Sequence, residues 1–381
     1  MIVSSVGQNR TGSTRAASTT TGAPVPSVLK SAAPKPAFMP FGDAARVLGT
    51  LVVVIGHVCD MIVFANPPYS LNDWRVCNLA DAASRWAVPV YVMLSGSLLL
   101  DPNRAETASQ FYKKRLARLG VPILFWSALY MWLSVYYTGW ATPEQAWRDL
   151  ALGKPYVHLH FIFRIAGLYA FTPVIRIFLK HAEEKLIVTI TVLCLFLASG
   201  DSVTNAFTGS ESSMFLRFIP FVGYYLLGYV LRNRMLTKRS LLGCWMLAIS
   251  CVLLLAGGTE LLARMYGPVP YPSRGFMLYD FLSPVRVAFA VSAWLIIVNT
   301  FDRKWAESGP GQFVSKWLAP MTLGIYLAHL LFREILTVHG FNAVWPNVWI
   351  GIPLMTAMIY IPSCIFVFVV MRIPYLKRIV L

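Results

Sequence analysis

The sequence predicts an all-α membrane protein that crosses the bilayer about ten times and keeps both termini in the cytoplasm. Only 13% of its 381 residues are charged, whereas soluble domains carry about 25%. The mean hydropathy is +0.59, and apolar stretches close to the roughly 20 helical residues that span a hydrocarbon core recur along the chain. These observations exclude an ordinary water-soluble protein. The few charged residues inside the apolar stretches therefore carry most of the functional information.

The chain divides into a tail and one membrane domain. Residues 1–40 are rich in Ser, Thr, Ala and Pro, contain four basic residues and no acidic one, and lack a long apolar run. We expect a disordered cytoplasmic tail rather than a signal peptide. Residues 41–381 are expected to form the membrane domain, with spans at 42–65, 78–100, 117–138, 159–180, 185–200, 213–232, 240–263, 280–300, 316–336 and 345–371. The fifth of these is the shortest.

The basic residues test this arrangement independently of hydropathy. With the tail in the cytoplasm and the loops alternating, 23 of the 33 Lys and Arg residues fall on the cytoplasmic side and 5 on the opposite side. This asymmetry follows the positive-inside rule. The net charge of +16 therefore reflects the basic residues on the cytoplasmic side of the membrane. We expect no nucleic-acid partner. The six cysteines show no paired spacing of a zinc or redox motif, and we expect no metal.

The first span carries ionisable residues on one face. Arg46 and His57 are eleven residues apart, which corresponds to three helical turns and a rise of about 16 Å. Arg46 would lie at the cytoplasmic mouth and His57 in the outer half of the bilayer. Asp60 follows His57 by three residues, a spacing at which a carboxylate can orient an imidazole. A histidine that only packs among helices explains the spacing equally well, but ionisable groups inside spans are usually functional.

The second and third spans contribute a small-residue motif and a basic cluster. Ser95 and Gly96 are more typical of a close contact between helices than of a nucleophile. Arg115 and Arg118 project from one face at the cytoplasmic start of the third span. Basic residues at this position help to set the orientation of the chain in the membrane, and that role alone explains their presence. Together with Arg46 they would also suit a polyphosphate ligand, because guanidinium groups match phosphate oxygens.

A second group of polar residues is expected at one depth in the outer half. It consists of Asp81, Arg85, His158, His160, Arg164, Arg217, Glu260, Asp280, Arg286, His329, Arg333 and Glu334, with the hydroxyls of Tyr169, Tyr224, Tyr225 and Tyr326. Arg333 and Glu334, at a helix end, are interpreted as a structural ion pair. The group as a whole predicts a polar outer cavity, lined by aromatic residues, of the kind that binds a sugar.

Five sets of motifs resemble acyltransferase family 3, integral-membrane enzymes that O-acylate bacterial surface and exported glycans. They are Asp43-x-x-Arg46 with His57, Arg85-x-x-x-Pro89 with Ser95-Gly96, Lys114-Arg115-x-x-Arg118-x-x-x-Pro122, His158-Leu-x-Phe161 with Gly167-x-Tyr169-x-x-Thr172-Pro173, and Thr322-x-Gly324-Ile-Tyr326-x-x-His329. The resemblance covers most of residues 42–336 and looks closest to members that acetylate lipid-linked or polymerising polysaccharide repeats. One departure is His160, which stands where many relatives have Trp.

The resemblance implies a multi-pass enzyme of the bacterial inner membrane, surrounded by lipid. Acetyl-coenzyme A, or another acyl-coenzyme A, would enter from the cytoplasm as co-substrate, and a saccharide hydroxyl, which a polyprenyl lipid can carry, would accept the acyl group from outside. The assigned site residues are His57, Asp60 and Asp43 for catalysis; Arg46, Arg115, Arg118 and Ser95 for the donor; and Arg85, His158, His160, Arg164, Tyr326 and His329 for the acceptor.

Two mechanisms and two other functions stay open at this point. Neutral His57 can act as general base on the attacking hydroxyl while Asp60 holds its tautomer, or His57 or Ser95 can be acylated first. A secondary transporter or glycan exporter would also bury Arg, His and Asp within its spans, although the two halves of the chain show no matching repeats. A purely structural subunit leaves the polar face around His57 unexplained.

Overall fold

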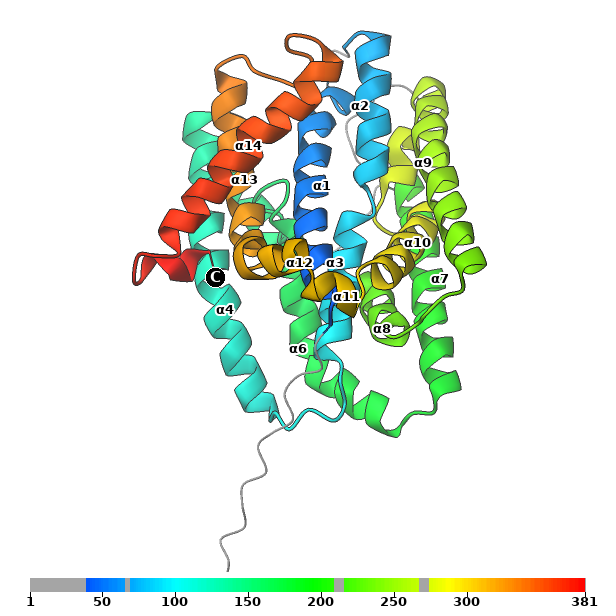
Figure 1. The fold of residues 1–381 in the computed structure, drawn as a ribbon. Helices are drawn as coiled ribbons and strands as arrows, with labels where there is room; N and C mark the ends of the chain where they lie inside the picture. Colours follow the sequence, from blue (N-terminus) through cyan, green and yellow to red (C-terminus); the bar gives the residue numbers. More distant parts are fainter. Residues whose placement is uncertain (1–38, 66–68, 209–215, 267–273, 381) are drawn as a thin grey trace, which may run out of the picture. The chain divides into compact units, whose positions relative to one another are not determined.

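The computed structural model describes residues 39–65, 69–208, 216–266 and 274–380. Every regular element in this part of the chain is a helix (Figure 1), which confirms the predicted all-α class. The predicted tail, residues 1–40, lies almost entirely outside the described residues.

The α-helices are α1 Phe41–Val63, α2 Leu71–Ser84, α3 Ala87–Leu99, α4 Ala108–Trp132, α5 Pro143–Ala151, α6 His160–His181, α7 Glu184–Thr208, α8 Val222–Leu231, α9 Lys238–Tyr266, α10 Pro284–Thr300, α11 Arg303–Glu307, α12 Gly309–Phe313, α13 Thr322–Val338 and α14 Val348–Val370. Short π or 3₁₀ helices are η1 Leu133–Tyr137, η2 Ile219–Phe221, η3 Arg274–Tyr279, η4 Val314–Leu318, η5 Ala319–Met321 and η6 Leu376–Ile379.

Within the described residues, eight helical segments are long and apolar enough to cross a membrane, which confirms a multi-pass membrane protein. The short fifth prediction, 185–200, belongs to α7, a helix of 25 residues. Two predicted spans, 78–100 and 213–232, correspond to shorter helices. The first is divided between α2 and α3, and the second contains the 10-residue α8.

The break between α2 and α3 has an identifiable cause in Pro89. This residue lies in the first turn of α3 and has no N–H, so the carbonyl oxygen of Arg85, four residues earlier, lacks its helical donor. The guanidinium of Arg286 on α10 donates to that carbonyl instead, with an Nε–O distance of 2.7 Å. The motif Arg85-x-x-x-Pro89 therefore ends one helix and begins another. It also holds Arg85 in an ion pair with Asp81, one turn earlier on α2.

Helix α1 lies at the centre of the fold (Figure 1), in contact with α2, α3, α10, α13 and α14. One hydrophobic cluster joins α1 to α2, α9 and α10 around Val54, Val58 and Ile62. A larger cluster packs α3, α4, α6, α8, α10 and α13 around Trp126 and Trp294. Because neighbouring helices surround α1, its ionisable side chains near the C-terminal end are enclosed by protein.

Helices α3 and α8 pack so closely through two glycines that their backbones touch. A Cβ atom on Gly96 would lie 1.8 Å from the carbonyl oxygen of Tyr225, and one on Gly228 would lie 1.9 Å from that of Met93. Gly96 thus forms the close contact between helices that the Ser95-Gly96 motif predicted.

We expect Gly96→Ala and Gly228→Ala each to destabilise the protein by about 1–3 kcal/mol, because α3 and α8 must move apart. Gly243→Ala on α9 is a matched control, since a Cβ there meets no atom within 4 Å. Thermal unfolding of the purified protein in detergent measures all three variants. Equal melting temperatures for Gly96→Ala and Gly243→Ala would contradict the close contact.

Candidate functional site

A cavity of about 840 Å³ lies beside the end of α1 that carries His57. Its wall includes most of the residues predicted for catalysis and for the acceptor: His57, Asp60, Arg85, His158, His160, Arg164 and Tyr326. Asp81, Arg217, Asp280 and Arg286, which were expected at the same depth, also line it. The structure therefore brings polar residues from six separate segments of the chain to one cavity that aromatic side chains also line.

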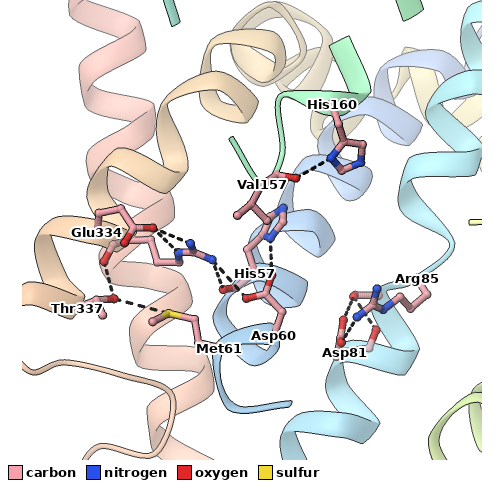
Figure 2. A network of polar contacts seen from close by, with 11 residues as sticks. His57, Asp60, Met61, Asp81, Arg85, Val157, His160, Glu334 and Thr337 are labelled. Carbon is pink, nitrogen blue, oxygen red and sulfur yellow. Dashed lines mark hydrogen bonds and ion pairs between the residues drawn. The ribbon is translucent and has the colours of Figure 1, made fainter. Parts of the chain in front are cut away.

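The imidazole of His57 is held by Asp60 (Figure 2). Its Nδ1 lies 2.8 Å from Oδ2 of the carboxylate, and the two side chains are 19% and 15% exposed. Because a carboxylate can only accept, the ring proton belongs on Nδ1, and Nε2 carries the lone pair. This is the tautomer that a general base at the cavity wall requires.

Asp60 is fixed in turn by Arg333 of α13. Nη1 of Arg333 lies 3.3 Å from Oδ1 of Asp60 and 3.2 Å from the carbonyl oxygen of His57. The same guanidinium donates to Oε1 of Glu334 at 2.6 and 3.0 Å. Arg333 and Glu334 are only 2% and 0% exposed. A continuous chain of charged contacts thus runs from Glu334 through Arg333 and Asp60 to His57.

The sequence alone predicted Arg333 only as one half of a structural ion pair and did not predict its contact with Asp60. The ion pair with Glu334 exists, but Arg333 also contacts His57 and Asp60. A signal was present in the sequence, because Arg333 follows His329 by four residues and so lies on the same face of α13.

Two more imidazoles lie next to His57. The ring centres of His329 and His158 lie 5.3 and 6.4 Å from that of His57, and 5.1 Å from each other. His158 precedes α6 and lies outside the spans. Burial lowers the pKa of His158 well below its usual value, and the neighbouring His329 and His57 lower it further, so His158 is neutral at pH 7. Within the described part of the chain, His158 lines the cavity whereas His329 does not.

The other residues predicted for the acceptor are held by specific contacts. The hydroxyl of Tyr326 donates to the carbonyl oxygen of His158. His160 is anchored through Nδ1, 2.6 Å from the carbonyl oxygen of Val157 (Figure 2). The guanidinium of Arg164 lies over the rings of Phe221 and Phe281, 4.6 and 4.7 Å from their centres. Such contacts fix the polar groups before a ligand binds.

The residues predicted for the donor gather toward the other end of α1. Nη1 of Arg46 lies 2.5 Å from Oδ1 of Asp43, and Arg118 of α4 is close enough to Arg46 and Arg115 for their charges to interact. Asp43 precedes His57 by fourteen residues, which is a rise of about 21 Å. Asp43 therefore contacts Arg46 and lies far from His57.

Further charged and aromatic residues surround this basic cluster. Glu106 pairs with Lys114 at 2.8 Å and with Arg176 at 3.6 Å. Burial raises the pKa of Glu106, but the hydrogen bond from Lys114 and the charges of Arg176 and Arg115 lower it by more. Arg115 also lies 5.1 Å from the ring centre of Phe111.

Ser95 stands apart from both groups. It is half-buried on α3, beside the glycine that packs on α8, and the described residues of the cavity wall do not include it. Across the described ranges, no group of three or more His, Cys, Asp or Glu side chains is arranged to hold a metal ion.

A comparison with protein families matches residues 40–371 to a family described as an acyltransferase domain. No match was found among curated proteins or among solved structures. The matched residues include the cavity, the chain of contacts from Glu334 to His57 and the basic cluster around Arg46.

Proposed function

The chain belongs to this acyltransferase family, and from that premise we propose that it transfers an acetyl or other acyl group from cytoplasmic acyl-coenzyme A to a polysaccharide hydroxyl on the outer side of a bacterial inner membrane. The observation that carries the proposal is the hydrogen bond of 2.8 Å between His57 and Asp60 at the wall of a cavity large enough for a saccharide. The arginines toward the other end of the same helix supply a complementary site for the donor's phosphates.

In the proposed reaction, Nε2 of neutral His57 accepts the proton of the acceptor hydroxyl while the hydroxyl oxygen attacks the thioester carbonyl carbon. The ester C–O bond forms and the C–S bond breaks. The proton then passes from His57 to the leaving thiolate, so the products are the ester and free coenzyme A. Asp60 stabilises the transient imidazolium. A covalent route through acylated His57 or Ser95 is the alternative, and rapid-quench detection of an acetyl-enzyme would reveal it.

The donor would enter at the basic cluster and extend along α1. Arg46, Arg115 and Arg118 would bind its phosphates, and the thioester arm would cover the rise of about 16 Å between Arg46 and His57. Both termini would then lie in the cytoplasm, as the distribution of basic residues predicts.

The double substitution of Arg115 and Arg118 by glutamine should weaken acetyl-coenzyme A binding by about tenfold or more, because charge-assisted hydrogen bonds to phosphate contribute about 1.5–3 kcal/mol. Turnover at saturating donor should change much less. Isothermal titration with acetyl-coenzyme A and steady-state kinetics measure the two quantities, and Arg239→Gln on α9 is a control. An unchanged donor affinity would mean that Arg115 and Arg118 only set the orientation of the chain in the membrane.

The acceptor would occupy the 840 Å³ cavity, which is large for a single sugar and suits part of a polysaccharide repeat. Its contacts would come from residues that line the wall and offer donors, acceptors and aromatic faces: Arg85, His158, His160, Arg164 and Tyr326. A polyprenyl-linked glycan is a suitable acceptor, since its lipid would lie beside the helices.

Mass spectrometry of the host's surface or exported polysaccharide, with and without this protein, tests the proposed function. Loss of O-acetyl groups from an otherwise intact polymer is the expected result. Loss of the polymer itself, with acetylation intact on what is left, would instead favour a glycan exporter.

A further inference from the structure

A second pocket adjoins the main cavity in the segment between α4 and α6. It has a volume of about 350 Å³ and is lined by Trp140, Ala141, Gln145, Arg148, Asp149 and Lys154. Four of these residues, Trp140, Ala141, Asp149 and Lys154, also line the cavity that contains His57. The two spaces therefore share a wall, and we call the smaller one the α5 pocket.

The backbone around the α5 pocket is held in place by hydrogen bonds. Thr142 and Gln145 form a capping box at the start of α5, with N–O distances of 3.3 and 2.8 Å. Gly139, at φ +66°, supplies the left-handed conformation that turns the chain after η1. Beyond α5, the N–H of Lys154 donates to the carbonyl oxygen of Asp149 at 2.9 Å. The pocket is thus formed in advance of any ligand.

A row of aromatic side chains in contact with one another connects the α5 pocket to His158. Trp140 is 53% exposed and lies parallel to Tyr156, with 6.2 Å between ring centres and 3° between planes. Tyr156 stacks on Tyr130 at 4.6 Å, and the ring of Tyr130 lies 4.9 Å from that of His158. The indole of Trp140 is therefore a supported, half-exposed platform at the junction of the two spaces.

This combination of groups fits a sugar ring. An indole face packs well against the C–H groups of a pyranose. Asp149 can accept hydrogen bonds from hydroxyls, and Arg148, Lys154 and the side-chain N–H groups of Gln145 can donate to them. The side-chain oxygen of Gln145 accepts from the N–H of Thr142. The volume lies near the lower end of the range for small-molecule sites, which suits one monosaccharide unit better than a chain.

We propose that the α5 pocket binds a sugar unit adjacent to the one that is acylated, so that the enzyme recognises an oligosaccharide or polymer rather than a single sugar. This inference rests on the proposed transfer to a glycan hydroxyl. It extends the acceptor site beyond the membrane-spanning helices, onto a segment that the reaction at His57 does not use.

The test compares acceptors of two lengths with acetyl-coenzyme A at saturation. The probes are the host's polysaccharide after mild alkaline deacetylation, cut into fragments of several repeats, and the single sugar that carries the modified hydroxyl. Trp140→Ala should raise the KM for the long fragment by about tenfold, the equivalent of 1.4 kcal/mol, and raise the KM for the single sugar much less. Trp140→Phe should restore most of the affinity, because it keeps an aromatic face.

Trp147→Ala is the matched control, since Trp147 lies on α5 and is 65% exposed but lies outside the pocket lining. Arg148→Gln, at a residue that lines the α5 pocket but not the cavity around His57, gives a second measurement and should raise the KM for the long fragment alone. An unchanged KM for the long fragment in Trp140→Ala, or equal losses on both acceptors, would overturn the inference while wild-type activity upholds the proposed function. A wild-type protein that acylates neither acceptor would contradict the proposed function itself.

Discussion

Replacing His57 with glutamine is expected to slow acyl transfer by about 10²–10⁴-fold, the range that general-base assistance supplies. Glutamine can still place an amide N–H near Asp60, so the contact that anchors the side chain, 2.8 Å in the native protein, has a replacement. It offers no basic nitrogen to the acceptor hydroxyl. Initial rates of ester formation at saturating donor, with donor binding measured in parallel, give the size of the loss.

His181→Gln is the matched control for this substitution. His181 is exposed in the last turn of α6, far along the chain from His57 and Asp60, and its replacement should leave the rate unchanged. A folded His57→Gln protein that binds donor and transfers acyl groups within a few-fold of the native rate would show that His57 is not the base.

Replacing Arg333 with methionine is expected to destabilise the protein by about 3–5 kcal/mol, the typical cost of removing one partner from a buried charge pair. The guanidinium contacts Glu334 at 2.6 Å and Asp60 at 3.3 Å. Without it, Glu334, which is 0% exposed, loses the guanidinium that it contacts, and Asp60 loses one of the positive charges near it. Thermal and denaturant unfolding in detergent measure the loss.

The exposed ion pair between Arg303 and Glu307 provides the comparison. Its atoms are 2.7 Å apart, but the side chains are 81% and 62% exposed, so Arg303→Met should cost less than about 1 kcal/mol. Similar losses for Arg333→Met and Arg303→Met would mean that the buried chain from Glu334 to His57 contributes little to the fold.

The sequence predicted which candidate residues lie at a similar level along their segments, because a helix converts residue number into distance along its axis at about 1.5 Å per residue. This is why His57, His158, His160 and Tyr326, from three separate segments, could be expected at one level before the structure showed that they line one cavity. The same conversion separates Arg46 from His57 along α1.

The sequence could not predict which residues at a given depth touch each other. Arg333 on α13 contacts Asp60 on α1, and that contact depends on which face of α13 is turned toward α1. The sequence predicted one span at 78–100, whereas Pro89 divides it, and the replacement donor to the Arg85 carbonyl comes from Arg286, 201 residues later. The α5 pocket depends on a turn and a capping box outside the spans, where hydropathy carries no signal.

The most direct test of the account is transfer by the purified chain in lipid nanodiscs, supplied with radiolabelled acetyl-coenzyme A and deacetylated host polysaccharide. The account predicts that label enters the polysaccharide as an alkali-labile ester with the native protein, and that it does not with a His57→Gln protein that still binds the donor. A native protein that leaves the polysaccharide unlabelled, or a His57→Gln protein that labels it equally, would contradict the account.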